Sequence, residues 1–304
     1  MNNLGILLAL VTAFGYSSNY VLMQMGMKKS KNDPGVFISL FSAVVTIILI
    51  YGIYLVYMLI GQAPFAPFNW WGIFFFLLAG FVTAFLGRTI LIHSIKRIGP
   101  SRAAGIKNAA PIFTIIVAVS LMGERITPLA GVGILIIFSA LFLQARHDFK
   151  QTPADSSRDK KVGMFLACGA AVSFGLGHAI RKQGVLFYPD PILGSLLGTL
   201  FALLVLVVGE ATRGQLGETI KRNFKQLNGY YIAGGVMTGI AQMSFFGAVM
   251  FTNVSYVSVV TATEPVMTVL LSSLLLKKDE KITRRLVLTA CAVFVGTTIL
   301  VLAG

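Results

Sequence analysis

Ten apolar runs, each about as long as one membrane-spanning helix, constrain this chain more than any other feature of its sequence. Inside a bilayer no water pairs with backbone polar groups, so only helices and closed barrels cross it, and a helix needs about 20 apolar residues to do so. The first run follows no basic residue and is longer than a signal-peptide core, so we interpret it as a retained helix. The sequence therefore predicts an all-α polytopic membrane protein with ten transmembrane helices. They are expected at residues 4–26, 35–60, 71–93, 102–122, 128–145, 162–186, 191–211, 229–251, 254–276 and 284–303.

The composition excludes a soluble globule and a nucleic-acid partner. Charged residues make up only 12% of the chain and hydrophobic residues 56%, with a mean hydropathy of +0.82, whereas soluble domains carry about 25% charged residues. The net charge of +14 lies in short connections between the apolar runs and forms no basic groove interleaved with aromatic residues. Cys168 and Cys291 fit no metal-ligand spacing and are interpreted as small packing residues. No nucleotide-binding loop is present, so neither a cofactor nor a metal is expected.

The chain is an internal duplication. At an offset of 154 positions Ser101 aligns with Ser255, and Pro111 aligns with Pro265. At an offset of 158 positions four small residues of the first helix align with small residues of the sixth. These pairs are Gly5 with Gly163, Ala9 with Ala167, Ala13 with Ala171 and Gly26 with Gly184. We assign the first repeat to residues 1–146, a polar cytoplasmic linker to 147–161 and the second repeat to 162–304.

An odd number of helices in each repeat places the second repeat upside down relative to the first, as in many secondary transporters. The connections also differ sharply in charge, because the odd-numbered ones hold 20 Lys and Arg and the even-numbered ones hold 3. Under the positive-inside rule the odd-numbered connections are cytoplasmic and both termini face outward. Residues 216–227 place Leu216, Ile220 and Phe224 at helical spacing beside basic residues. This pattern predicts a short interfacial helix, the alternative being an ordinary solvated loop.

The repeated segments and the first helix resemble the drug/metabolite transporter superfamily, in its ten-helix EamA-type branch. The resemblance is carried by residues 99–111, 123–127, 263–265 and 280–283. Residues 16–20 are similar to the family's Trp-Gly-Ser-Asn-Phe type of signature, with Tyr16 in place of Trp and Ser17 in place of Gly. The resemblance covers nearly the whole chain and implies a polytopic carrier with two EamA repeats, often an exporter of amino acids or other small metabolites. It leaves the substrate open, because the superfamily also includes carriers of sugars, nucleotide sugars and drugs.

Two prolines occupy equivalent positions inside apolar segments of the two repeats. Pro111 and Pro265 each lack a backbone donor and crowd the carbonyl four residues earlier. These carbonyls belong to Lys107 in the first repeat and Thr261 in the second. Each repeat is therefore expected to contain a helix kink with a freed carbonyl at comparable depth. We interpret both prolines as hinges beside a cavity, and the alternative is a kink with only a packing role.

Two charged residues fall inside these segments, where a charge is costly without water or a partner. Glu264 shares a helix face with Thr261, Thr268 and Ser272, and it could bind a substrate amine, couple transport to protons or form half of a buried pair. Lys107 is interpreted as a ligand for an acidic group of the substrate or of Glu264. The alternatives for Lys107 are a structural salt bridge with Glu264 and an extended side chain that reaches the membrane surface.

Other polar residues are expected to line the same cavity. Arg88 and Gln242 are equivalent at the offset of 154 positions, although Arg88 could instead reach the membrane surface. His178 occupies the place of Tyr20 in the first repeat, and its alternative is a structurally satisfied histidine. The predicted substrate-binding set is Lys107, Glu264, Asn19, Arg88, Gln242, His178, Asn108, Thr261 and Thr268.

Four charged residues near the predicted helix ends receive structural interpretations. Arg181 and Lys182 are expected to be interfacial anchors near the outer end of the sixth helix, or to attract anions at the mouth of the cavity. Glu124 and Glu280 precede the fifth and tenth helices, where a carboxylate favours the helix N-terminus.

These features together predict a secondary transporter that works by alternating access. The first, third, fourth, sixth, eighth and ninth helices would line its cavity, with the fifth and tenth outside as scaffold. Lys107, Arg88 and Glu264 together favour an amphoteric cargo such as an amino acid, exported across the inner membrane, and proton coupling through Glu264 is a further hypothesis. The alternatives are a passive facilitator of the same fold and a polytopic membrane enzyme or lipid-handling protein. No enzymatic activity is expected, and the protein should be a monomer or weak homodimer in the bilayer.

Overall fold

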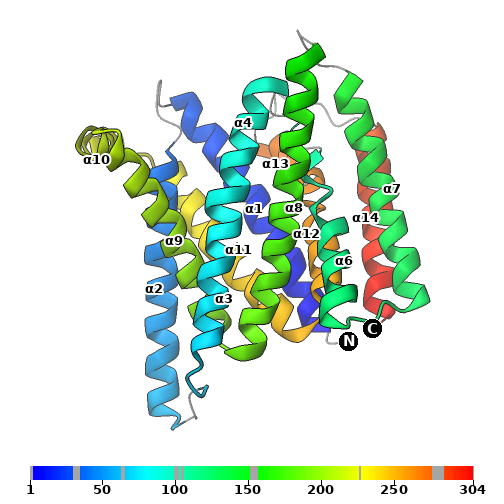
Figure 1. Ribbon diagram of the computed structural model, residues 1–304, viewed down its shortest axis with the longest axis horizontal. Helices are drawn as coiled ribbons and strands as arrows, with labels where there is room; N and C mark the ends of the chain where they lie inside the picture. Colours follow the sequence, from blue (N-terminus) through cyan, green and yellow to red (C-terminus); the bar gives the residue numbers. More distant parts are fainter. Residues whose placement is uncertain are drawn as a thin grey trace.

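The computed structural model describes residues 3–29, 35–62, 66–98, 103, 106–150, 157–225, 227–275 and 284–303. Within these ranges every regular element is helical (Figure 1). The elements are α1 (Asn3–Lys29), α2 (Val36–Ile60), α3 (Trp70–Gly80), the π-helical segment η1 (Phe81–Gly87), α4 (Arg88–Ile98), α6 (Ala110–Met122), α7 (Pro128–Lys150), α8 (Ser157–Phe187), α9 (Pro191–Thr212), α10 (Leu216–Lys225), α11 (Gly229–Phe251), α12 (Val254–Thr261), α13 (Glu264–Leu275) and α14 (Arg284–Leu302).

The helix ends follow local sequence signals. Asn69, Asp190 and Asn228 stand immediately before α3, α9 and α11, and each side chain accepts a hydrogen bond from a backbone N–H of the first turn. Asp190 accepts two, from the backbone nitrogens of Ile192 at 3.1 Å and Leu193 at 2.9 Å. Such caps satisfy donors that a helix cannot pair internally. The sequence-predicted boundaries agree with these starts to within a residue.

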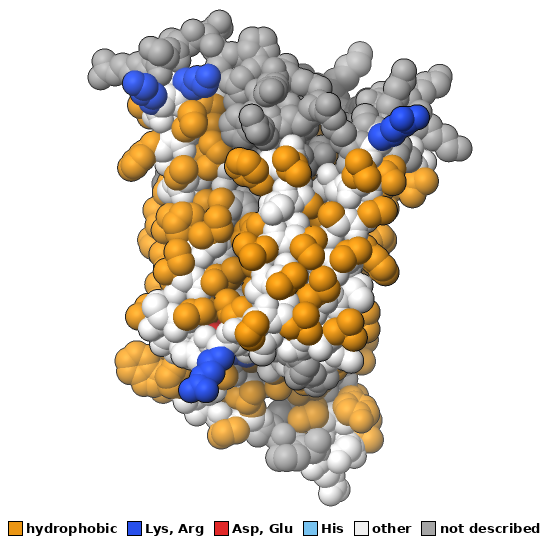
Figure 2. Space-filling view, turned by 90° about the vertical axis from the view of Figure 1, so that its right-hand side faces the viewer, with side chains coloured by type: hydrophobic (Ala, Val, Ile, Leu, Met, Phe, Trp, Pro, Cys, Tyr) orange, Lys and Arg blue, Asp and Glu red, His pale blue; other side chains and the backbone are white. Residues whose placement is uncertain are grey.

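The outer surface is that of a membrane protein. Seven helical segments are long and apolar enough to span a bilayer, and three shorter apolar helices accompany them, namely Ala110–Met122, Pro128–Leu143 and Val287–Leu302. Figure 2 shows hydrophobic side chains over the middle of the face that it presents, with most of the Lys and Arg side chains visible there near one end. Cys168 and Cys291, interpreted from the sequence as small packing residues, are unpaired and lie exposed on the helix surface rather than in the core. A small apolar side chain suits a lipid-facing helix surface as well as a core. The chain is a multi-pass membrane protein.

The two halves pack on each other reciprocally. In the first half α1 lies against α11 and α13, while in the second half the equivalent α8 lies against α3, α4 and α6. Gly5 of α1 approaches Thr252, and Gly163 of α8 approaches Ile98; in each place a Cβ on the glycine would come within 2.7 Å or less of that side chain. These pairs are equivalent at the offsets of 158 and 154 positions found in the sequence. The duplication is therefore visible in the tertiary contacts.

The last helices of the two halves, α7 and α14, pack together at one side of the bundle (Figure 1). Gly133 and Gly296 face each other closely, since a Cβ on either would lie within 2.9 Å of the other's carbonyl oxygen. Helix also extends into both ends of the segment assigned to a linker, because α7 runs to Lys150 and α8 begins at Ser157. Residues 151–156 lie outside the described part of the chain.

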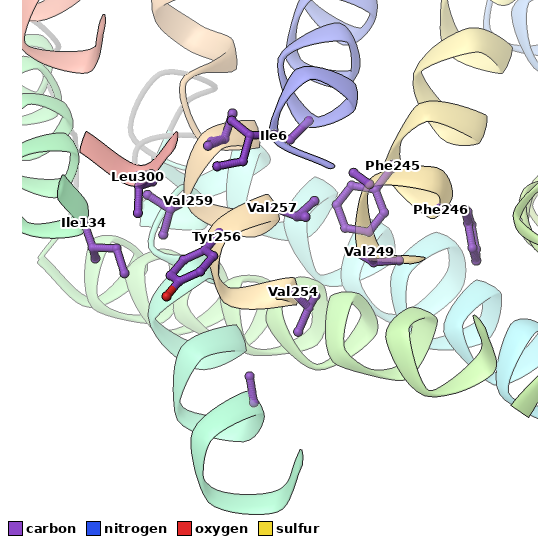
Figure 3. Packing of buried hydrophobic residues seen from close by; sticks show 14 of the residues in the cluster. Ile6, Ile134, Phe245, Phe246, Val249, Val254, Tyr256, Val257, Val259 and Leu300 are labelled. Carbon is purple, nitrogen blue, oxygen red and sulfur yellow. The ribbon is translucent and has the colours of Figure 1, made fainter. Parts of the chain in front are cut away.

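The largest hydrophobic core lies at the end of the bundle that holds both termini (Figure 1). It joins residues of α1, α3, α6, α7 and α14 to the last turns of α8 and α11 and to α12. Figure 3 shows Val254, Tyr256, Val257 and Val259 of α12 among these side chains. Two smaller clusters lie elsewhere among the described residues, one that joins Val266 to Ala140 and Val293 and one around Ile98. The main core of the described residues thus lies toward the end that holds the termini.

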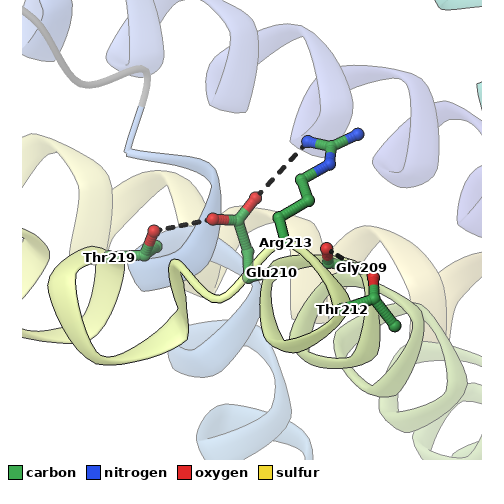
Figure 4. A network of polar contacts seen from close by, with 5 residues as sticks. All are labelled: Gly209, Glu210, Thr212, Arg213 and Thr219. Atoms are coloured by element: carbon green, nitrogen blue, oxygen red, sulfur yellow. Dashed lines mark hydrogen bonds and ion pairs between the residues drawn. The ribbon is translucent and has the colours of Figure 1, made fainter.

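Residues 216–225 form the helix α10, as their apolar spacing predicts. Its junction with α9 is held by Glu210, whose carboxylate accepts a hydrogen bond from the Thr219 hydroxyl at 2.7 Å and lies 3.8 Å from Arg213 (Figure 4). Phe224 of α10 packs edge-on against Phe41 of α2, with ring centroids 6.3 Å apart. These contacts attach α10 beside the end of the bundle opposite the termini (Figure 1).

Candidate functional site

Both proline-containing segments are interrupted by a two-residue turn, which we call a break. Residues 106–107 are helical, Asn108 and Ala109 form a turn, and α6 begins at Ala110. In the second repeat α12 ends at Thr261, Ala262 and Thr263 form the turn, and α13 begins at Glu264. An irregularity therefore lies directly before Pro111 and Pro265 in both repeats.

The reason lies in the position of each proline within its helix. Pro111 and Pro265 are the second residues of α6 and α13, where the missing N–H would have had no helical partner and the fixed φ angle suits a first turn. A helix restarts at each proline, and the positive dipole end of that helix lies inside the protein. Glu264 is the first residue of α13, so a carboxylate stands at one of these two positive ends.

Equivalent residues support the two breaks. The Ser17 hydroxyl of α1 donates to the backbone oxygen of Glu264 at 2.8 Å. At the matching place in the other repeat, Gly175 of α8 lies so close to Ala110 that a Cβ would be 2.6 Å from its carbonyl oxygen. Each first helix of a repeat thus packs directly on the restarted helix of the other repeat. The two breaks lie at equivalent positions in the bundle.

Glu264 lies at the centre of a cluster of polar side chains. The Tyr20 hydroxyl of α1 is hydrogen-bonded to its carboxylate, and Lys107, next to the break of the first repeat, is close enough to influence it electrostatically. Tyr20 in turn lies within electrostatic range of Arg88. The structure therefore brings together three of the predicted residues, Glu264, Lys107 and Arg88.

Arg181 is part of the same cluster, and the expectation that it anchors the protein at the membrane interface was wrong. Its guanidinium is hydrogen-bonded to Tyr16 and donates to the Thr83 hydroxyl at 3.4 Å. It also stacks on two aromatic rings, 5.0 Å from the centroid of Phe245 and 5.5 Å from that of Phe246. Sequence reasoning placed Arg181 by its distance from a helix end. Only the packing of α8 against α1 and η1 shows that it points into the bundle.

His178 lies one turn before Arg181 and connects the cluster to the first break. Its Nδ1 is 3.1 Å from the Ser258 hydroxyl, which donates to the Thr114 hydroxyl at 3.0 Å. Thr114 donates to the backbone oxygen of Gly175 at 3.1 Å. This chain of hydrogen bonds crosses α8, α12 and α6. His178 is thus structurally paired, and it also lies near Lys107 and Arg181.

Arg88 follows directly after the π-helical segment η1. A π-helical turn contains an extra residue, which rotates everything after it relative to a regular α-helix, and such turns are frequent at functional sites. The helical periodicity of the sequence gives no sign of this change. The structure thus gives a local reason for the direction in which Arg88 projects.

The remaining predicted residues lie near the cluster or outside it. The Asn19 side chain accepts a hydrogen bond from Ser39 at 3.4 Å and faces α2 and α11. Thr261 and Thr268 donate to backbone oxygens of their own segments, those of Ser258 and Glu264. Asn108 forms part of the first break, and Gln242 is half-buried on α11 with no polar contact to the cluster among the described residues.

The cluster is accessible at one of its side chains. Tyr20 lies near Glu264, Tyr16 and Arg88, which belong to other turns and helices, yet 49% of its surface is exposed. Tyr20 is therefore the member of the cluster that a solute could reach first.

The end of the bundle that holds the termini is closed by two charged side chains. Glu124 accepts hydrogen bonds from the backbone nitrogens of Val254 at 2.7 Å and Ser255 at 3.2 Å, and from the Ser255 hydroxyl at 2.7 Å. It therefore caps α12 of the other repeat, whereas the sequence assigned it to the helix that follows it. Glu280, its equivalent, lies outside the described residues.

Lys182 completes this closure, so its interpretation as an interfacial anchor was also wrong. Its ammonium group donates to the backbone oxygens of Val249 and Thr252, at the C-terminus of α11. It also lies within electrostatic range of Glu124. The two side chains thus hold opposite helix ends at the α11–α12 turn, each with the charge that its helix dipole favours.

The described residues contain no group of three or more His, Cys, Asp or Glu side chains arranged to hold a metal ion. The cluster combines one carboxylate, two tyrosines, one histidine and three cations. It can bind polar and charged groups of a solute, and any proton transfer there would involve Glu264, a tyrosine or His178.

Comparisons with known proteins agree with this architecture. The model of the EamA-like transporter family matches residues 3–146 and 161–302. Among solved structures 28 chains match significantly, and one of them, described only as a crystal structure of a protein, has a TM-score of 0.67 and 12% sequence identity over 95% of each chain. At this identity the likeness shows the fold alone. Curated proteins give no significant match. The two family matches together cover almost the whole sequence, and the chain belongs to the EamA-like transporter family.

Proposed function

We propose that this protein is a secondary transporter that moves a small polar solute across a membrane by alternating access. The observation that carries the proposal is the convergence of Glu264, Lys107, Arg88 and Arg181 beside two equivalent helix breaks. Secondary transporters with internal repeats bind their substrates at such discontinuous helices near the bilayer midplane. Membership of a family of transporters supports the same conclusion.

In this proposal the chain crosses the membrane ten times, in two inverted five-helix repeats. The seven candidate spans and the three shorter apolar helices supply that number. The reciprocal packing of α1 on α11 and of α8 on α3 and α4 supports the inversion. The excess of basic residues in the odd-numbered connections favours their cytoplasmic location and places both termini outside, in the inner membrane of a cell that has one.

The contacts at the end of the bundle that holds the termini support alternating access. The large core and the Glu124 and Lys182 contacts lie at that end, while Tyr20 of the polar cluster is 49% exposed. We assign this arrangement to a state closed toward the outside and accessible from the cytoplasm. Movement of the half-helices about Pro111 and Pro265 would produce the opposite state.

Transport by the purified protein in proteoliposomes tests the proposal. Counterflow of a labelled solute requires a binding site that alternates between the two sides, and it is expected for the wild-type protein but not for empty liposomes. Repeating the measurement with and without an imposed ion gradient separates an active exporter from a passive facilitator of the same fold. Absence of counterflow for every solute in a broad metabolite panel would contradict the proposal.

The orientation has its own test. Single cysteines at Gly217 in α10, where a Cβ would have no atom within 4 Å, and at Ile60, which is 80% exposed at the end of α2, lie at opposite ends of the bundle. In a background without the two natural cysteines, a membrane-impermeant thiol reagent should label position 60 from outside intact cells and position 217 only after lysis. The reverse pattern would invalidate the assigned orientation.

A further inference from the structure

The polar cluster has an unbalanced charge. Its described side chains include three cations, Arg88, Lys107 and Arg181, and one carboxylate, that of Glu264. None of these cations forms an ion pair with a carboxylate among the described residues, where the one salt bridge is that of Arg213 with Glu210 on the surface. With Glu264 ionised, the cluster carries two more positive charges than negative ones.

An excess positive charge at membrane depth needs compensation. Charges inside membrane proteins normally face water or a partner of opposite sign, because an isolated charge there costs several kcal/mol. The described contacts of Arg181 and Lys107 do not supply enough negative charge to neutralise both cations. The guanidinium of Arg181 lies over Phe245 and Phe246, and the ammonium of Lys107 lies 5.1 Å from the ring centroid of Phe174. Aromatic faces hold a cation in place without neutralising it.

Arg181 also retains donors for a further partner. A guanidinium carries five N–H donors, and its described hydrogen-bond partners are Tyr16 and Thr83. The planar group can therefore still bind a carboxylate through two parallel hydrogen bonds. Lys107 beside the first break, which like Arg181 lies near His178, offers a second cation to the same solute.

We infer that this cluster is an anion-binding site and that the transported solute is a carboxylate carrying more negative than positive charge. Arg181 and Lys107 bind its carboxylate groups, and Glu264 with Tyr20 binds an amine or hydroxyl group where the solute has one. This inference rests on the proposed transport function and narrows it from amphoteric solutes in general to acidic ones. It also gives Arg181, which the sequence placed at the membrane interface, a direct role in selecting the solute.

Four probes of similar size but different charge test the inference. Succinate, glutamate, glutamine and lysine are titrated into the purified protein in detergent, and the thermal shift of unfolding gives the apparent Kd of each. Succinate and glutamate are expected to bind at least about tenfold more tightly than glutamine, which corresponds to about 1.4 kcal/mol. Lysine is expected to bind most weakly. Equal affinities, preference for lysine, or no binding by either anion would overturn the inference.

Variants of Arg181 identify the side chain responsible. Arg181→Gln should weaken glutamate binding by about tenfold or more while changing glutamine binding little, and Arg181→Lys should restore part of the difference. Arg213→Gln, whose side chain is 72% exposed at the end of α9, is the matched control and should bind like the wild type. If Arg181→Gln does not fold, Lys107→Gln provides the same comparison. Unchanged selectivity in the folded variants would overturn the assignment.

The same probes in counterflow separate this inference from the proposed function. Exchange of glutamine or lysine in preference to the anions would leave the protein a transporter and refute its selection for negative charge. If no solute is exchanged although the anions bind with the expected preference, the anion site stands and transport is refuted.

Discussion

Replacing Glu124 should destabilise the protein more than replacing any exposed carboxylate. Its carboxylate accepts three hydrogen bonds at the N-terminus of α12, from two backbone nitrogens and one hydroxyl. The contact joins the two repeats, since Glu124 follows α6 and α12 belongs to the second half. Removing the carboxylate leaves these donors unpaired at a half-buried site.

The magnitude follows from two limits. Loss of an ordinary N-cap side chain costs about 1 kcal/mol, whereas a hydrogen bond to a charged group contributes about 1.5–3 kcal/mol. The contributions of hydrogen bonds that share one carboxylate cannot simply be added. We therefore expect Glu124→Ala to lower the free energy of unfolding by about 3 kcal/mol, and Glu124→Gln, which keeps one acceptor oxygen, by about half as much.

Thermal unfolding in detergent, followed by intrinsic fluorescence, measures this effect. At about 2 °C per kcal/mol for a chain of this size, Glu124→Ala should lower the Tm by about 6 °C. Glu218→Gln on the exposed surface of α10 is the control and should shift the Tm by less than about 1 °C. A Tm for Glu124→Ala that equals that of the control would refute the role assigned to this contact.

Three further predictions concern other parts of the fold. Lys182→Met removes the cation at the C-terminus of α11 and should lower the free energy of unfolding by about 1–3 kcal/mol; a double-mutant cycle with Glu124 should show coupling, and strict additivity would contradict it. Gly133→Ala should lower the free energy of unfolding by about 1–3 kcal/mol, because its Cβ would meet the carbonyl oxygen of the facing glycine in α14 at 2.8 Å. Gly131→Ala is the control: its Cβ would have no atom within 4 Å, so this variant should be neutral or slightly stabilising. Glu264→Gln should abolish flux driven by a pH gradient in proteoliposomes while counterflow persists, and full gradient-driven flux in this variant would remove Glu264 from proton coupling.

Sequence periodicity determines most of the helical framework. Apolar runs of spanning length leave the backbone no alternative to helix within a bilayer, and Asp190 before Pro191 or Asn228 before Gly229 marks where a helix starts. The duplication can also be detected in the sequence, because equivalent positions such as Gly5 and Gly163 hold the same residue. Both properties depend on residues close together in the chain or on comparison of the chain with itself.

The partners of individual charged side chains could not be predicted from the sequence. Sequence distance from a helix end suggested an interfacial position for Arg181 and Lys182, and it suggested that Glu124 caps the helix that follows it. The structure pairs these residues with Tyr16, with the C-terminus of α11 and with the N-terminus of α12. Each partner lies in a segment far away in sequence, so no local pattern could identify it.

The two breaks were predictable from the sequence only in part. A proline in an apolar segment predicts an irregularity, and both Pro111 and Pro265 mark one. How the chain continues at each proline depends on the segments packed against it, and here Ser17 of α1 donates to the backbone oxygen of Glu264 at 2.8 Å. The sequence alone thus determined that this is a duplicated helical membrane protein with a defect in each half. Only the tertiary structure decided which side chains meet at those defects, because that depends on how the two halves pack together.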